Sequence, residues 1–232
     1  MRRTLGGGLA AVLGALVLLA AGSSSAPAAS SEDIASTHAY VEAANQALSA
    51  VVKTWPKVEA GIRKLDARYQ SECAHVAAGS PQSEEEQKLA HEVAGALWAS
   101  GYHTDAAIER RFVRAIGRLH WSNPTVNRYA RRLIVSLNEM VALQIPDLCS
   151  DVRAWAAGGY KAVPASTSAY ADHVDSIEIK EIPRNLLVAY ARPSDKGLIA
   201  RTERLATRFE ELEFVVGQND WDNLLELLSL NQ

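Results

Sequence analysis

Cysteine is scarce in this sequence, with Cys73 and Cys149 the only two among 232 residues. Two cysteines are too few for a disulfide scaffold or a four-cysteine zinc site, and they do not form a C-x-x-C motif. Long apolar runs are scarce too. The one such run, residues 9–21, has 13 residues, whereas a membrane-spanning helix needs roughly 20. The rest of the sequence therefore offers no candidate for a transmembrane helix.

The sequence also lacks the motifs of several common kinds of enzyme. It contains no G-x-S-x-G motif, which would mark a serine nucleophile, and neither of the glycine-rich motifs that bind nucleotides. His91 and Glu92 begin an H-E-x-x-H zinc motif, but Gly95 stands where the second histidine is required. Glu72 and His75 form one Glu-x-x-His pair, whereas carboxylate-bridged di-iron bundles need two. These absences predict no catalytic residue, no metal site and no cofactor.

The charge balance gives no sign of a nucleic-acid partner. The chain has 24 basic and 27 acidic residues, and the first 28 residues hold Arg2, Arg3 and no acid. The remainder therefore carries 22 basic and 27 acidic groups, a formal charge of −5. Because neutralisation of phosphate by lysine and arginine drives nucleic-acid binding, a mildly acidic chain predicts no such partner.

Residues 1–28 have the three parts of a secretory signal peptide, namely an arginine pair, the apolar run and then small residues. The small residues suit cleavage after Gly22 or after Ala28, and retention of the segment as an anchor is the alternative. Export predicts a secreted or extracytoplasmic protein of a bacterial cell envelope, in an oxidising compartment where cysteine pairs form disulfides. We therefore predict one Cys73–Cys149 disulfide. It would close a 77-residue loop and stabilise the fold by roughly 4–5 kcal/mol.

Apolar residues recur at three- and four-residue steps along almost the whole remaining chain, a pattern typical of amphipathic helices. Strand-like alternation is confined to residues 176–180. We therefore predict an all-α fold, a bundle of seven or eight helices. These helices form a single domain at 37–232, preceded by a short polar lead-in at 29–36.

Capping residues and prolines divide this pattern into helices. The clearest predicted starts are Thr54 before Pro56, Asn123 before Pro124, Asp147 after Pro146, and Asp195 after Pro193. The last of these starts opens a long C-terminal helix, which residues 217–220 are expected to interrupt.

Arginine is unusually dense between residues 110 and 132. Seven arginines and His120 lie there without one acid; the arginines are Arg110, Arg111, Arg114, Arg118, Arg128, Arg131 and Arg132. Arginine presents a planar fork of donors that suits carboxylates and phosphates. The candidate anion-binding residues are therefore Arg110, Arg114, Arg118, Trp121, Arg128 and Arg132. The alternative is an outer face balanced by acidic helices, such as Glu84–Glu86 or the glutamates between Glu203 and Glu226.

Three segments resemble a group of uncharacterised secreted all-helical bacterial proteins that carry a cysteine pair. The segments are Glu72–His75, Leu119–Asn123 and Pro146–Trp155. The resemblance covers most of the chain beyond the signal peptide and implies the same helical fold and disulfide. It implies no activity, substrate or catalytic residue.

Taken together, these features favour a secreted, non-enzymatic helical protein that binds an anionic ligand or partner at the cell envelope. A small secreted all-α enzyme acting on an anionic small molecule is the first alternative, and a metal or haem carrier is the second. An enzyme pocket should bring arginine and glutamate side chains together in a dry cleft, with at least one carboxylate of shifted pKa. A binding scaffold should instead leave its arginines in solvent.

Overall fold

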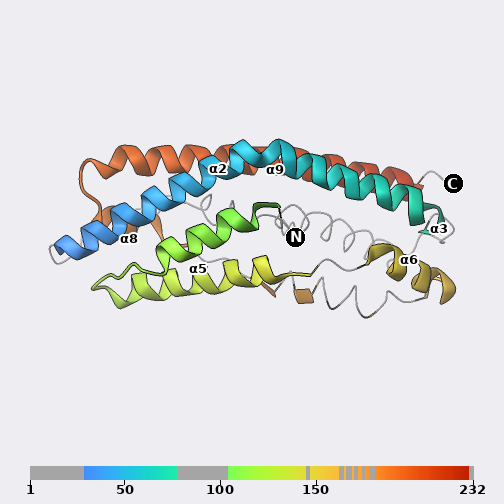
Figure 1. Cartoon of the computed structure of the whole chain (residues 1–232), viewed down its shortest axis with the longest axis horizontal. Coiled ribbons are helices and arrows are strands. Elements are labelled where there is room, and N and C mark those ends of the chain that lie inside the picture. The colour runs from blue at the N-terminus through green and yellow to red at the C-terminus, as the bar shows by residue number, and fades with distance from the viewer. Residues whose placement is uncertain are drawn as a thin grey trace.

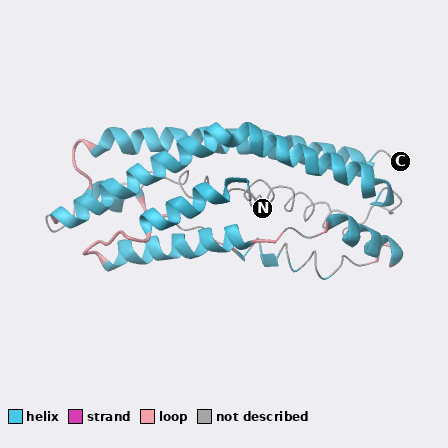
Figure 2. Cartoon of the chain, in the orientation of Figure 1, coloured by secondary structure: helices cyan, strands magenta, loops and turns pink. Residues whose placement is uncertain are grey.

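The computed structural model describes residues 29–77, 104–144, 147–161 and 181–229, with a few single positions between 165 and 177; side chains are described up to Leu212. All regular structure within these ranges is helical, which confirms the predicted all-α class there. The described helices lie lengthwise in an elongated bundle and are joined by loops (Figure 1, Figure 2). The predicted signal peptide at 1–28 and the segments holding Glu84–Glu86 and His91 lie outside the described residues.

The longest described helix is α2, Ser31–Tyr69. It begins at a capping box in which Ser30 and Asp33 bind each other's backbone N–H groups. Residues 31–36, expected as a short polar lead-in, are therefore the first turns of this helix. Burial explains the difference, because Asp33 and two further polar side chains of these turns, Ser36 and Thr37, lie in the protein interior.

The predicted helix start at Pro56 is also wrong, because α2 continues through this proline. Thr54 does not cap a new helix. Its hydroxyl oxygen lies 3.1 Å from the carbonyl oxygens of Ala50 and Val51, within the same helix. A proline inside a helix costs roughly 3 kcal/mol. The apolar stripe on both sides of Pro56 is buried in one core, and this burial outweighs the cost.

The carboxyl end of α2 leads into a short π-helix, η1, Gln70–Ala74, and a final turn, α3, His75–Ala77. Cys73 of η1 is buried and forms a disulfide with Cys149, which confirms the predicted bridge. Cys149 belongs to α6, Leu148–Ala157, whose N-cap is Asp147 as predicted. Arg153 of α6 also donates to the carbonyl oxygen of Glu72. These bonds tie α6 to the end of α2.

The described chain resumes at residue 181 and forms two helices: α8, Arg184–Tyr190, and α9, Asp195–Ser229. α9 starts at the predicted residue, and its backbone is helical throughout 217–220, so the expected interruption is absent. The helix runs beside α2 in the same direction (Figure 1). The pairing is regular along both helices: His38 contacts Asp195, Asn45 contacts Thr202 and Trp55 contacts Phe209.

A helical stretch at 104–116 and α5, Pro124–Ala142, complete the described bundle. The stretch 104–116 runs antiparallel to α2, since Asp105 meets Thr54 near its start and Phe112 meets Tyr40 further on. After a turn at 117–123 the chain reverses into α5, which starts at the predicted N-cap Asn123. Seven or eight helices were predicted, whereas six α-helices have defined bounds among the described residues, one of them the three-residue α3. The continuity of α2 accounts for part of this difference.

Candidate functional site

The turn at 117–123 is fixed firmly to the start of α2. The carboxylate of Asp33 accepts hydrogen bonds from the backbone N–H and the hydroxyl of Ser122, both at 2.6 Å. It also accepts from the backbone N–H and the hydroxyl of Ser30, at 3.3 and 2.8 Å. Burial by itself raises the pKa of Asp33, but these four donors together outweigh burial and lower its pKa. The turn is therefore held by a carboxylate that keeps its charge.

Trp121, a predicted member of the anion site, lies in the core. Its side chain is 0% exposed, its Nε1 donates to Thr37 Oγ1 at 2.9 Å, and its ring packs edge-on against Tyr40. Asn127 of α5 further exchanges two hydrogen bonds with its backbone. Trp121 therefore positions the turn from inside and does not reach the surface where the arginines lie.

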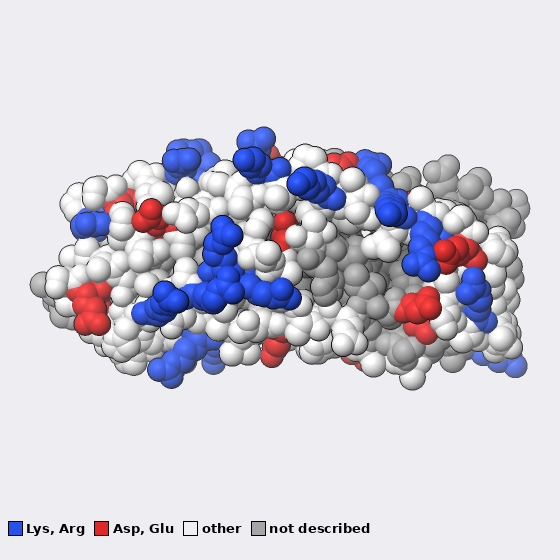
Figure 3. Space-filling model, in the orientation of Figure 1, with Lys and Arg blue, Asp and Glu red and all other residues white. Residues whose placement is uncertain are grey.

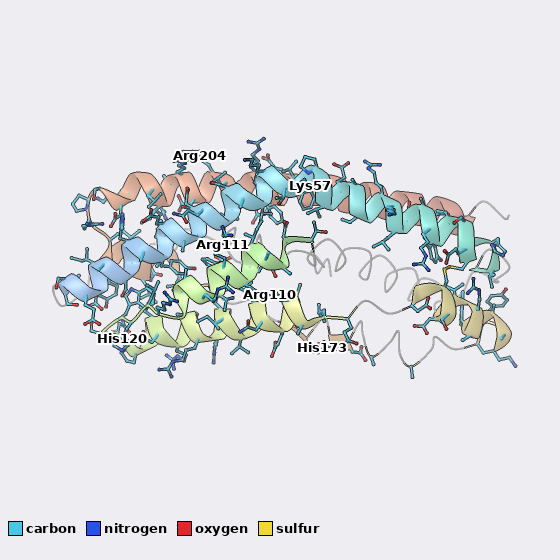
Figure 4. The ribbon with its side chains drawn as sticks, viewed as in Figure 1. Lys57, Arg110, Arg111, His120, His173 and Arg204 are labelled. Carbon is cyan, nitrogen blue, oxygen red and sulfur yellow. A yellow bond between two sulfur atoms is a disulfide. The ribbon has the colours of Figure 1, made fainter. Side chains whose placement is uncertain are left out.

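All seven arginines of the dense segment are exposed. We call their surface the arginine face; it consists of Arg110, Arg111, Arg114, Arg118, Arg128, Arg131 and Arg132. Basic side chains gather where the stretch 104–116 lies against α5 (Figure 3), and Arg110 and Arg111 belong to this region (Figure 4). Where basic side chains gather in Figure 3, they lie on the outer surface of the molecule.

No arginine of this face forms an ion pair with an acid in the described part of the chain. Arg128 makes a single polar contact, from Nη2 to Thr125 Oγ1 at 3.3 Å. Of the acids expected to balance the face, Glu203 instead pairs with Arg184, Nε to Oε1, at 2.6 Å. Glu84–Glu86 lie outside the described residues. The structure thus shows a positive surface on which the described acids leave the arginines uncompensated.

The inner side of the same helical stretch carries two acids that the sequence analysis did not single out. Asp105 and Glu109 are buried, and Thr54 Oγ1 donates to Asp105 Oδ1 at 2.7 Å. Both carboxylate oxygens of Glu109 are buried without a hydrogen-bond partner among the described residues. Burial, with a smaller effect of the nearby Asp105 charge, raises the pKa of Glu109 to about 8, and Arg110 opposes this shift.

A signal for this pair exists in the sequence. Positions 105 and 109 precede the buried Phe112 and Ile116 at steps of four, three and four, so all four residues share one face of a helix. Placing 105 and 109 on that stripe would have revealed two acids on the core side.

The acids and the arginines of this stretch do not converge. Glu109 is 0% exposed, while Arg110, Arg114 and Arg118 reach solvent on the outer side. A ligand held by the arginines would therefore not contact the one described carboxylate whose pKa is strongly raised. The arrangement suits electrostatic binding at a surface better than acid–base chemistry in a cleft.

Within the described ranges, no three His, Cys, Asp or Glu residues are placed to share a metal ion. Glu72 accepts a hydrogen bond from Arg68 at 2.8 Å, and His75 is exposed. None of the described helices is both long enough and apolar enough to cross a membrane. Comparisons with protein-family models, with curated proteins and with solved structures find no match to this chain.

Proposed function

We propose that this protein is an extracytoplasmic, non-enzymatic helical binding protein that takes an anionic ligand or partner on its arginine face. One observation carries the proposal. Seven exposed arginines lie in a segment, residues 110–138, that contains no acid, and none of them is paired with an acid in the described structure. An exposed cluster of uncompensated arginines creates a positive potential that attracts anions over a distance of about 10 Å at ordinary ionic strength.

The extracytoplasmic location is supported by two features. The N-terminal segment has the composition of a signal peptide, and the Cys73–Cys149 disulfide is typical of proteins in oxidising compartments. Cleavage of the signal and release from the envelope belong to this proposal.

The arrangement of charges favours binding over catalysis. General acid–base catalysis requires a titrating group within hydrogen-bond reach of the substrate. Glu109 is enclosed in the core, whereas all seven arginines of the arginine face are exposed to solvent. For this reason we favour a binding protein over a small all-α enzyme.

The double variant Arg114→Ala/Arg118→Ala tests the proposal. We expect it to bind heparin, used as a generic polyanion, about tenfold more weakly at moderate salt. The negative slope of log K against log salt concentration should become shallower by about 1.4, because two contacts to the polyanion are lost. Isothermal titration at three salt concentrations measures both quantities.

The matched control is Arg63→Ala/Arg68→Ala, which removes the same charge from α2. There, Arg63 pairs with Glu59 and Arg68 with Glu72. Unchanged binding by the Arg114/Arg118 variant, or an equal loss by the control, would reject the arginine face as the binding surface.

A further inference from the structure

We infer that the occupant of the arginine face is a linear polymer of phosphate groups, which lies across the arginines of the stretch 104–118 and of α5. This inference rests on the proposed function and names the chemistry of the partner. The juxtaposition that supports it is a row of arginines on one element beside a second row on the antiparallel element that follows it.

The first row has a regular spacing. Arg110 and Arg114 are one helical turn apart, and Arg118 continues the row in the turn after the helix. A four-residue step in a helix advances by about 6 Å, so the row offers repeated guanidinium groups along one direction. A ligand with evenly repeated charges can use all of them, whereas a compact anion reaches one or two.

The second row lies on α5, where Arg128, Arg131 and Arg132 are three and four residues apart and therefore share one side of the helix. The two elements lie side by side at Gly117, where a Cβ atom would be 3.9 Å from Ile134 of α5, an ordinary van der Waals contact. Because Asp33 clamps the intervening turn, the two rows keep a fixed relation to each other.

The openness of the face argues for a polymer. Small-molecule sites are concave and enclose most of the ligand, whereas these arginines are all exposed. A single exposed ion pair contributes little. Useful affinity on such a face requires many contacts to one ligand, with release of the counterions condensed on a polyanion.

The composition of the face argues for phosphate. All seven cations between residues 110 and 132 are arginines and none is a lysine. The guanidinium fork binds two oxygens of a phosphate at once, which the ammonium group of lysine does not. Among the described residues the exposed large apolar side chains are Val135 and Val188. Val135 lies on α5 one helical turn after Arg131, so the face carries one exposed large apolar side chain of that helix and no exposed Phe, Trp or Tyr. This is less than bilayer anchoring or the stacking of single-stranded nucleic acids requires.

Inorganic polyphosphate of defined length is the probe, titrated into the full exported chain by calorimetry. We expect affinity to rise at least 100-fold between triphosphate and a chain of about 15 phosphates and to change little beyond that length, once the chain spans both rows. Arg110→Ala/Arg114→Ala and Arg128→Ala/Arg132→Ala should each weaken binding of the long chain about tenfold. The control Arg63→Ala/Arg68→Ala should leave it within about twofold.

Each other outcome overturns a defined part of the idea. Equal affinity for triphosphate and the long chain would reject the polymer and leave anion binding intact. Equal affinity for poly-glutamate of matched length would reject the preference for phosphate. Binding to vesicles rich in phosphatidylglycerol without binding to polyphosphate would assign the face to a membrane surface. If no anion binds, or if the control loses as much as the row variants, the proposed function fails as well.

Discussion

Two buried carboxylates, one at the start of α2 and one on the inner side of the stretch 104–116, have opposite pKa shifts. Asp33 is 1% exposed and Glu109 is 0% exposed, so both have lost almost all contact with water. Asp33 accepts four hydrogen bonds, and its pKa is lowered. Glu109 has no hydrogen-bond partner among the described residues, and its pKa is raised to about 8.

The two acids differ both in hydrogen-bond donors and in depth: four donors stabilise the charge of Asp33, whereas Glu109 lies deep in the core without a donor among the described residues. Burial penalises the ionised form of both groups. At Asp33, two serines replace the lost water with four donors. At Glu109, the charge of Asp105 opposes ionisation and the charge of Arg110 favours it. Asp33 therefore acts as a charged clamp, and Glu109 is held as a neutral acid below about pH 8.

The raised pKa of Glu109 predicts a large pH dependence of the free energy of unfolding. Its pKa is raised from 4.5 to about 8 in the folded protein, so the folded state binds more protons than the unfolded chain between those values. The free energy of unfolding therefore falls as pH rises from 4.5 to 8, by at most about 5 kcal/mol. Glu109→Gln should remove this component, as measured by urea unfolding at pH 5 and pH 9 with the disulfide intact.

The matched control is Glu139→Gln, which neutralises an exposed acid on α5 and should keep the pH dependence of the parent protein. Parallel pH profiles for Glu109→Gln and the parent would show that Glu109 is not the buried acid responsible.

The lowered pKa of Asp33 predicts a smaller loss of stability, at acidic pH. Asp33→Asn should lower the free energy of unfolding at pH 7 by about 2–3 kcal/mol, because donors from Ser30 and Ser122 lose a charged acceptor. The folded-state pKa of Asp33 lies below 3.8. Its contribution is therefore present above pH 3.8 and is lost as pH falls through the folded-state pKa. Acid titration followed by circular dichroism measures this loss.

In Asp33→Asn the acid-induced loss of stability should be shallower than in the parent. The same acid sensitivity in both proteins would count against Asp33 as the clamp. Glu32→Gln, which neutralises the exposed neighbour, serves as the control.

The smallest predicted effect is that of exposed Arg110 on the pKa of buried Glu109, across the stretch 104–116. The positive charge of Arg110 lowers the pKa of Glu109. Arg110→Gln should therefore raise the pKa of Glu109 further, by less than about one unit because Arg110 is exposed to solvent. Titration of the Glu109 carboxyl carbon by NMR gives the midpoint directly. If Arg114→Gln moves the midpoint as much as Arg110→Gln does, the coupling is not specific to Arg110.

Much of the local structure could be predicted because it depends on neighbouring residues. The caps at Asn123 and Asp147 mark true helix starts, since the residues that satisfy the first N–H groups of a helix are adjacent in sequence. Pro56 could not be interpreted in this way. Whether a helix continues through a proline depends on what its two flanking stripes pack against, and α2 packs both stripes into one core.

In the candidate site, too, some features depend on neighbouring residues and others on tertiary packing. All seven arginines are exposed, and their role as an anion site stays a prediction. Trp121 was misplaced, since its buried position depends on Thr37 and Tyr40, more than 80 positions away. Asp105 and Glu109 were missed because only apolar residues were taken to mark the buried face of a helix.

The sequence by itself determined the all-α class, the cysteine pair that becomes a disulfide and the acid-free arginine segment. All three follow from periodicity, composition and short-range spacing. Only the tertiary structure decided that Glu109 points inward while the arginines beside it point outward. Helical periodicity defines the faces of a helix, but the packing of α2 against the stretch 104–116 decides which face loses its water.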